Sequence, residues 1–73
     1  MVPDQKILID LIETRMPFGK YKDTYYDRLP ISYLEWFARN GFPAGRVGML
    51  LSTIYEIKLN GLEFLLVELR KRR

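Results

Sequence analysis

Neither cysteine nor histidine occurs in this chain of 73 residues. Without cysteine the protein has no disulfide bond and no thiol nucleophile, and without histidine it lacks the commonest general base at neutral pH. Together the two absences exclude every zinc or haem site built from cysteine or histidine ligands, so only carboxylate metal sites remain conceivable. We therefore expect a non-enzymatic protein that needs no cofactor.

Long apolar runs are also missing. No stretch approaches the roughly 18 apolar residues of a membrane span. Charged residues interrupt the apolar runs of the N-terminal segment, which does not resemble a secretory signal. We expect no membrane association and a cytoplasmic location. With 48% hydrophobic and 29% charged residues, the composition is typical of one small globular domain, which we place at residues 1–69, before a basic tail at residues 70–73.

The net charge is unevenly distributed. The formal value of +3 by itself suggests an acidic partner such as nucleic acid. Residues 70–73 are all basic, however, so residues 1–69 carry 8 basic against 9 acidic side chains. Within this body only residues 15–28 are net positive, with four basic and two acidic side chains. The segment at residues 15–28 is therefore the part of the body that would meet an acidic ligand.

Apolar residues at spacings of three and four predict helices over most of the chain. The first is expected at about residues 4–14, the second from Pro30 or Ser32 to Asn40, and the third at about residues 44–60. Residues 62–70 form either a fourth helix or, because of a continuous apolar run, a strand; the helix is favoured.

Several residues mark the helix ends. Pro30 fits the first turn of the second helix, whereas Ser32 and Glu35 have the spacing of a capping box two residues later. Gly41 is expected to cap the C-terminus of the same helix. In the third helix Gly48 costs about 1 kcal/mol relative to alanine, and with Gly45 and Ser52 it forms a strip of small residues at helical spacing. We therefore expect another element to approach closely there.

The segment between the first two helices has no helical period. It contains proline, glycine, aspartate and four aromatic residues, and we expect a short β-hairpin with a turn near Asp23, because aspartate tolerates left-handed backbone angles. The predicted fold class is therefore α+β and predominantly helical, with three or four short helices and a short β-hairpin between helix 1 and helix 2.

The same segment carries the candidate functional residues. In an extended strand, Lys20 and Lys22 would share one face, and cations interleaved with aromatic rings suit single-stranded nucleic acid, because rings stack on bases while cations contact phosphates. Alternatively, Phe18 and Tyr21 belong to the core and the lysines are solvated. The candidate nucleic-acid-binding residues are Lys20, Tyr21, Lys22, Tyr25, Arg28 and Arg39.

Two further groups of residues have a structural and a functional interpretation. Two carboxylates, here Asp23 and Asp27, are the least that a magnesium site would need. No third carboxylate is near in sequence, so surface ion pairs with Lys22 and Arg28 are favoured. The aromatic residues of the second helix would form either an exposed platform or part of the core. The core is favoured, and Trp36 is expected to be a structural residue; the three aromatic residues are Tyr33, Trp36 and Phe37.

Longer motifs resemble known families. The run from Met16 to Lys22, Leu29-Pro30, Tyr33-Leu34, Trp36-Phe37 and the run from Asn40 to Gly45 resemble a family of short bacterial proteins labelled quorum-sensing-regulated virulence factors. The resemblance covers most of the chain and implies a shared fold. Residues 16–37 also resemble the region that follows the nuclease domain in exodeoxyribonuclease X-like enzymes.

The resemblance also shows one departure. The family usually has a glycine where this chain has Asp23, and if that glycine contacts phosphate in relatives, Asp23 would repel it. Two hypotheses follow for function. The first is a nucleic-acid-binding or nuclease-accessory module; the second is a protein-interaction or regulatory module whose partner is itself or another protein.

Overall fold

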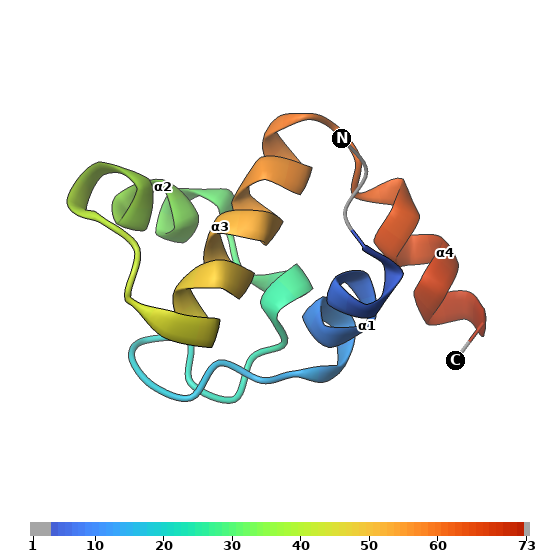
Figure 1. Ribbon diagram of the computed structural model, residues 1–73, viewed down its shortest axis with the longest axis horizontal. Helices are drawn as coiled ribbons and strands as arrows, with labels where there is room; N and C mark the ends of the chain where they lie inside the picture. The colour runs from blue at the N-terminus through green and yellow to red at the C-terminus, as the bar shows by residue number, and fades with distance from the viewer. Residues whose placement is uncertain (1–3, 73) are drawn as a thin grey trace.

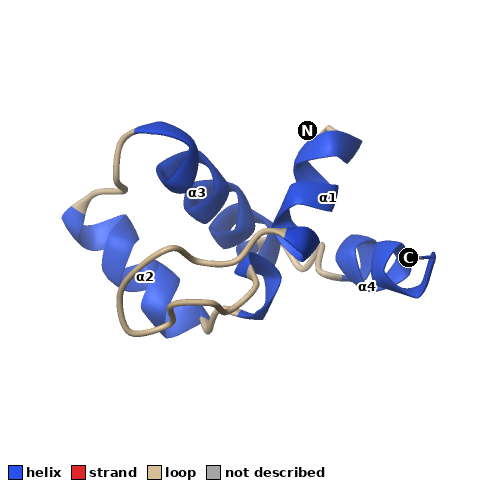
Figure 2. Ribbon diagram, turned by 90° about the horizontal axis from the view of Figure 1, so that it is seen from below, coloured by secondary structure: helices blue, strands red, loops and turns tan. Residues whose placement is uncertain are grey.

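The computed structural model describes residues 4–72, which contain four α-helices and one 3-10 turn joined by loops (Figure 1). The central helix α3 contacts α1 and α2, and α4 lies against α1. In both views α2 and α4 lie at opposite ends of the molecule (Figures 1 and 2). The elements in chain order are α1 (Gln5–Glu13), η1 (Tyr26–Arg28), α2 (Ile31–Asn40), α3 (Gly45–Leu59) and α4 (Phe64–Arg72).

The core lies among α1, η1, α2 and α3. Every side chain classed as buried among the described residues is hydrophobic, and α4 contributes only Leu66. The helix periodicity explains this, because the buried residues of α1 and α3 recur at spacings of three and four. The core consists of Leu8, Leu11, Ile12, Met16, Tyr26, Leu29, Leu34, Phe37, Leu50, Leu51, Ile54, Ile57 and Leu66.

The prediction for the C-terminus of α2 is confirmed, whereas one prediction for its N-terminus is wrong. Gly41 caps the C-terminus with a positive φ of 102° and donates its N–H to Phe37 O at 2.7 Å, as the sequence predicts. At the N-terminus, Pro30 is the cap residue and no side chain caps the helix. The predicted capping box is therefore wrong: since the helix already starts at Ile31, Ser32 lies within its first turn and cannot serve as N-cap.

Gly48 in α3 has the close neighbour that its cost in helix propensity predicts. A Cβ atom at this position would lie 1.6 Å from the carbonyl oxygen of Pro43 and 2.7 Å from its carbonyl carbon. The neighbour is the backbone of the loop that leads into α3 itself. Glycine therefore allows the connection from α2 to fold back over the first turns of α3.

The predicted β-hairpin is wrong: residues 4–72 contain a single antiparallel bridge, Arg15 with Tyr25, and no strand. The bridge is flanked by hydrogen bonds from Met16 N to Thr24 O (2.8 Å) and from Tyr26 N to Thr14 O (3.3 Å). It cannot grow, because Thr14 caps α1 and Tyr26 begins η1 on one side, while Pro17 has no N–H on the other. The described fold is all-helical rather than α+β.

The C-terminal segment is a helix, which confirms the favoured alternative. α4 extends to Arg72, so the basic residues at positions 70–72 belong to its last turn, and Arg73 lies outside the described residues. Cations in the last turn are favourable because they face the negative end of the helix dipole. Among the described residues, no helix is long and apolar enough to cross a membrane.

Candidate functional site

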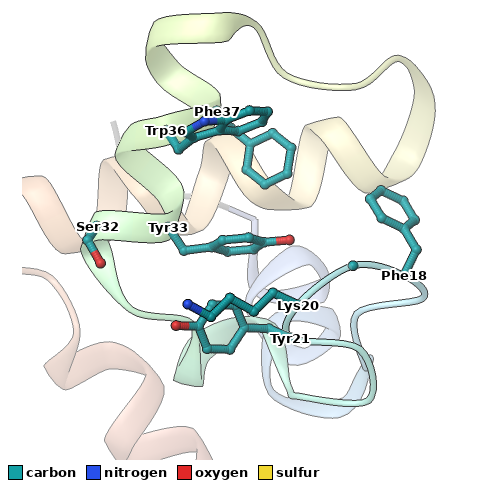
Figure 3. Close-up of a pocket in the computed structure, with 8 residues that line it drawn as sticks. Phe18, Lys20, Tyr21, Ser32, Tyr33, Trp36 and Phe37 are labelled. Atoms are coloured by element: carbon teal, nitrogen blue, oxygen red, sulfur yellow. The ribbon is translucent and has the colours of Figure 1, made fainter.

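A groove lined by aromatic side chains lies between α2 and the loop that precedes η1 (Figure 3). Its volume is about 560 Å³, within the usual range for sites that hold small ligands. We call it the aromatic groove and define it by its lining residues, Phe18, Gly19, Lys20, Tyr21, Ser32, Tyr33, Trp36 and Phe37.

Tight turns hold the loop side of the groove. The N–H of Lys22 donates to Gly19 O at 3.2 Å, and the N–H of Thr24 donates to Tyr21 O at 3.0 Å. Gly19 has a φ of +83°, and a Cβ there would lie 3.1 Å from the hydroxyl oxygen of Tyr33. Glycine therefore serves two needs at once: a left-handed backbone and a close approach of the loop to α2.

The helix side of the groove is a series of ring contacts. Tyr33, Trp36 and Phe37 occur at positions i, i+3 and i+4, which brings them to one side of α2. The ring centroids of Tyr33 and Phe37 lie 5.1 Å apart, and those of Trp36 and Phe37 lie 5.2 Å apart, both edge to face. Tyr21 joins the series from the loop, with its centroid 4.6 Å from that of Tyr33. Edge-to-face contacts of this kind stabilise the walls.

The groove rings differ in exposure. Phe37 is only 7% exposed and belongs to the core, whereas Trp36 is 56% exposed and Phe18 is 44% exposed. The prediction that Trp36 is a core residue is therefore wrong. Consecutive helix residues point about 100° apart, so a helix that packs through Leu34 and Phe37 leaves its Trp36 ring at the groove edge.

One positive charge accompanies the rings. Lys20 Nζ lies 5.6 Å from the centroid of the Tyr21 ring, a cation–π contact, and its side chain extends beside Tyr21 and Tyr33 (Figure 3). No carboxylate is among the lining residues. The pKa of Tyr33 is raised, mainly by burial and to a smaller extent by the neighbouring Tyr21. Its hydroxyl stays protonated at neutral pH, so the polar groups of the groove include a cation and neutral donors.

Only two of the six candidate residues line the groove. Lys20 and Tyr21 do so, whereas Lys22, Arg28 and Arg39 are exposed outside it. The expectation that Lys20 and Lys22 share the face of an extended strand is wrong, because both lie in a turn.

Tyr25 belongs to a separate cluster. The Arg15 guanidinium donates to the Tyr25 hydroxyl at 3.1 Å, and this hydrogen bond is the main reason that the pKa of Arg15 is raised. The guanidinium carbons of Arg15 and Arg70 lie 5.0 Å and 5.1 Å from the Tyr25 ring centroid. Tyr25 therefore already has two cationic partners within the protein.

The two aspartates of this segment have different roles. Asp27 pairs with Arg70 of α4 instead of the expected Arg28. Asp23 has a φ of +71°, as its expected turn position requires. Over residues 4–72, no three His, Cys, Asp or Glu side chains cluster in a way that could hold a metal ion.

Sequence reasoning missed most of the groove. It left Phe18 with a binding and a core interpretation, and it favoured the core for the aromatic residues of α2, because such spacing is typical of buried helix faces. The number of aromatic residues was the available signal: residues 18–37 contain seven of them, which is many for a domain whose small size limits how much it can bury.

Comparisons with known proteins identify the family. A family model described as "Putative quorum-sensing-regulated virulence factor" matches residues 4–69. The chain belongs to this family. A relative named "Uncharacterized protein YpeB" from Escherichia coli strain K12 is 44% identical over 69 residues, which cover 93% of this chain and 96% of the relative. The protein of the same name from Escherichia coli O157:H7 shows the same values.

The family assignment confirms the first resemblance that the sequence motifs indicate. The comparisons give no support to the second resemblance, to exodeoxyribonuclease X-like enzymes. No solved structure matches the chain.

Proposed function

We propose that this member of the family is a non-enzymatic protein-interaction module that holds a segment of a partner protein in its aromatic groove. The observation that carries the proposal is the exposure of Trp36, at 56%, and of Phe18, at 44%, which both line the same pocket. Large exposed rings around an apolar pocket are typical of interaction sites, where aromatic residues supply much of the binding energy.

The charge distribution favours a protein partner over nucleic acid. Residues 1–69 carry one more acidic than basic side chain, and Lys20 is the single cation that lines the groove. Binding to a nucleic acid depends on several phosphate contacts at once. A groove with many rings and one cation fits an apolar side chain of a peptide better.

The test is a selection of displayed peptides. Random 12-residue peptides on phage are selected on immobilised native protein, on Trp36→Ala and on Phe64→Ala. Phe64 is a matched control because it is an aromatic residue of similar exposure, 59%, on α4 at the other end of the molecule. We expect enrichment of apolar peptides on the native protein and on Phe64→Ala, and its loss on Trp36→Ala.

Trp36 also provides a direct binding signal. It is the single tryptophan of the chain, so its fluorescence emission reports on the groove alone. A selected peptide without tryptophan should shift this emission when added to the native protein. The proposal is wrong if no peptide is enriched, or if the same peptides are enriched on native protein and Trp36→Ala.

Single-stranded nucleic acid is a second candidate ligand, because Lys20 Nζ lies over the Tyr21 ring within the net-positive segment. An oligo(dT) titration followed by Trp36 emission tests it. Removing Lys20 and Lys22 would then lower the magnitude of the salt slope by roughly 1 to 2, at about 0.7 per phosphate contact. The control is deletion of residues 71–73, which leaves the Arg70 contact with Asp27 in place.

A further inference from the structure

We infer that the aromatic groove selects a peptide segment in which an Asp or Glu carboxylate adjoins a large apolar side chain, and that Lys20 determines this specificity. The inference rests on the proposed function and adds the chemistry of the partner to it. The rings would hold the apolar side chain, and the Lys20 ammonium would pair with the carboxylate.

The first argument is the unpaired charge of the groove. Its lining residues contain one cation and no carboxylate. The ion pairs among the described residues join Arg46 to Asp10, Lys58 to Glu63 and Arg70 to Asp27, so Lys20 has no acidic partner within them. A carboxylate that meets Lys20 at the groove would therefore come from the ligand.

The second argument is the distance between the charge and the rings. Lys20 Nζ lies 5.6 Å from the Tyr21 centroid, and Tyr21 is itself in contact with Tyr33. A ligand group that pairs with Lys20 is thus held beside the ring series that ends at Trp36 (Figure 3). Neighbouring residues of a peptide can provide an apolar group and a carboxylate at such close range.

The third argument is the match in charge and volume. A single ammonium matches a single carboxylate, whereas a nucleic acid backbone would require further cations at the groove, and Lys22, Arg28 and Arg39 lie outside it. A pocket of about 560 Å³ holds a small ligand or a short segment rather than a folded surface.

The experiment repeats the peptide selection on Lys20→Met, which removes the charge but keeps a long apolar stem. We expect the native protein to enrich peptides with Asp or Glu next to a large apolar residue. Lys20→Met should still enrich the apolar residue and lose the preference for the acidic one. Lys22→Met is the matched control, since Lys22 lies two residues away in the same turn region but outside the groove.

A synthetic pair of peptides then measures the effect. One carries the selected Asp and the other has Asn in its place, and both are titrated against Trp36 emission. On the native protein the Asp peptide should bind about three- to fivefold more tightly, the scale of a partly exposed ion pair. On Lys20→Met the two peptides should bind equally.

The outcomes separate the two proposals. Equal binding of both peptides to native protein, or an unchanged acidic preference on Lys20→Met, overturns the role of Lys20 while the interaction function stands. If the native protein enriches no peptide at all, both the interaction function and the role of Lys20 are wrong. If oligo(dT) alone shifts the Trp36 emission, the ligand is a nucleic acid and the peptide assignment is wrong.

Discussion

Arg70 on the last turn of α4 donates two hydrogen bonds to the carboxylate of Asp27 in η1, 43 residues earlier in the chain. The Nε–Oδ2 distance is 2.9 Å and the Nη2–Oδ1 distance is 2.6 Å, so the pair is bidentate. Its side chains are only 30% and 10% exposed. The pair therefore joins α4 to η1, in addition to the packing of α4 against α1.

Arg70→Met should therefore lower the free energy of unfolding by about 1 to 3 kcal/mol, because it leaves the largely buried Asp27 carboxylate without its partner. Lys71→Met is the control: Lys71 is exposed on the same helix, and its loss should change stability by less than about 0.5 kcal/mol. Urea denaturation measures both. The double variant with Asp27→Asn should recover part of the loss; purely additive effects would contradict a direct pair.

Two neighbouring rings of α2 should respond differently to truncation. Phe37→Ala should destabilise the protein by about 3 to 5 kcal/mol, because Phe37 is 7% exposed in the core. Trp36→Ala should cost less than about 1.5 kcal/mol, because Trp36 is 56% exposed and loses mainly its contact with Phe37. Denaturation midpoints followed by circular dichroism compare them. Unfolding of Trp36→Ala would make the ring structural and remove the basis for the groove as a binding site.

The helices could be predicted from the sequence because their signals are local. The apolar spacing of α1 and α3, Gly41 at the end of α2 and the close approach at Gly48 all depend on residues within a few positions of one another. The exposure of Trp36 depends instead on which side of α2 the rest of the chain covers. Periodicity identifies an apolar face but not how much of that face is covered.

The loop and the cluster around Tyr25 depend on long-range contacts. A run of β-favouring residues predicts strands, but whether a bridge extends into a ladder depends on both sides of it, here on Pro17 and on the start of η1 at Tyr26. Arg70 was expected in a basic tail, and Asp27 was expected to pair with Arg28, because the sequence does not reveal a pair that is 43 residues apart. The lining residues of the groove come from the loop and from α2, and only the tertiary fold brings these two segments together. The sequence could therefore predict only some of them.

Gly48→Ala should be destabilising although alanine is the better helix former. The added Cβ would lie 1.6 Å from Pro43 O, so the loop into α3 must move, at a cost of about 1 to 3 kcal/mol that exceeds the propensity gain of about 1 kcal/mol. Ser52→Ala, one turn later in α3, is the control and should be nearly neutral. A thermal midpoint of Gly48→Ala at or above that of the native protein would contradict the close approach.

Asp23 offers a test of its left-handed backbone. At a φ of +71°, a glycine variant should be more stable than an alanine variant by about 1 kcal/mol, because only glycine adopts this conformation without strain. At Lys22, which does not have a positive φ, the order should reverse, with alanine at least as stable as glycine. Chemical denaturation measures the stability of the four variants. If the alanine variant is more stable than the glycine variant at both positions, the turn does not require a left-handed residue.

Tyr26 should make the stability of the protein sensitive to alkaline pH. Burial raises the pKa of Tyr26 above its ordinary value, which is about 10 for tyrosine in an unfolded chain. The folded state therefore keeps the proton to higher pH than the unfolded state, so stability is unaffected below about pH 10 and falls as the pH rises from there through the folded pKa. Tyr26→Phe removes the titrating group with little change in core volume, so the variant should lose less stability than the native protein as the pH rises above about 10. Every other titratable group is common to both proteins, so the comparison cancels its effect. Urea midpoints at a series of pH values measure the difference, and parallel curves for the two proteins would show that Tyr26 does not contribute to the alkaline loss.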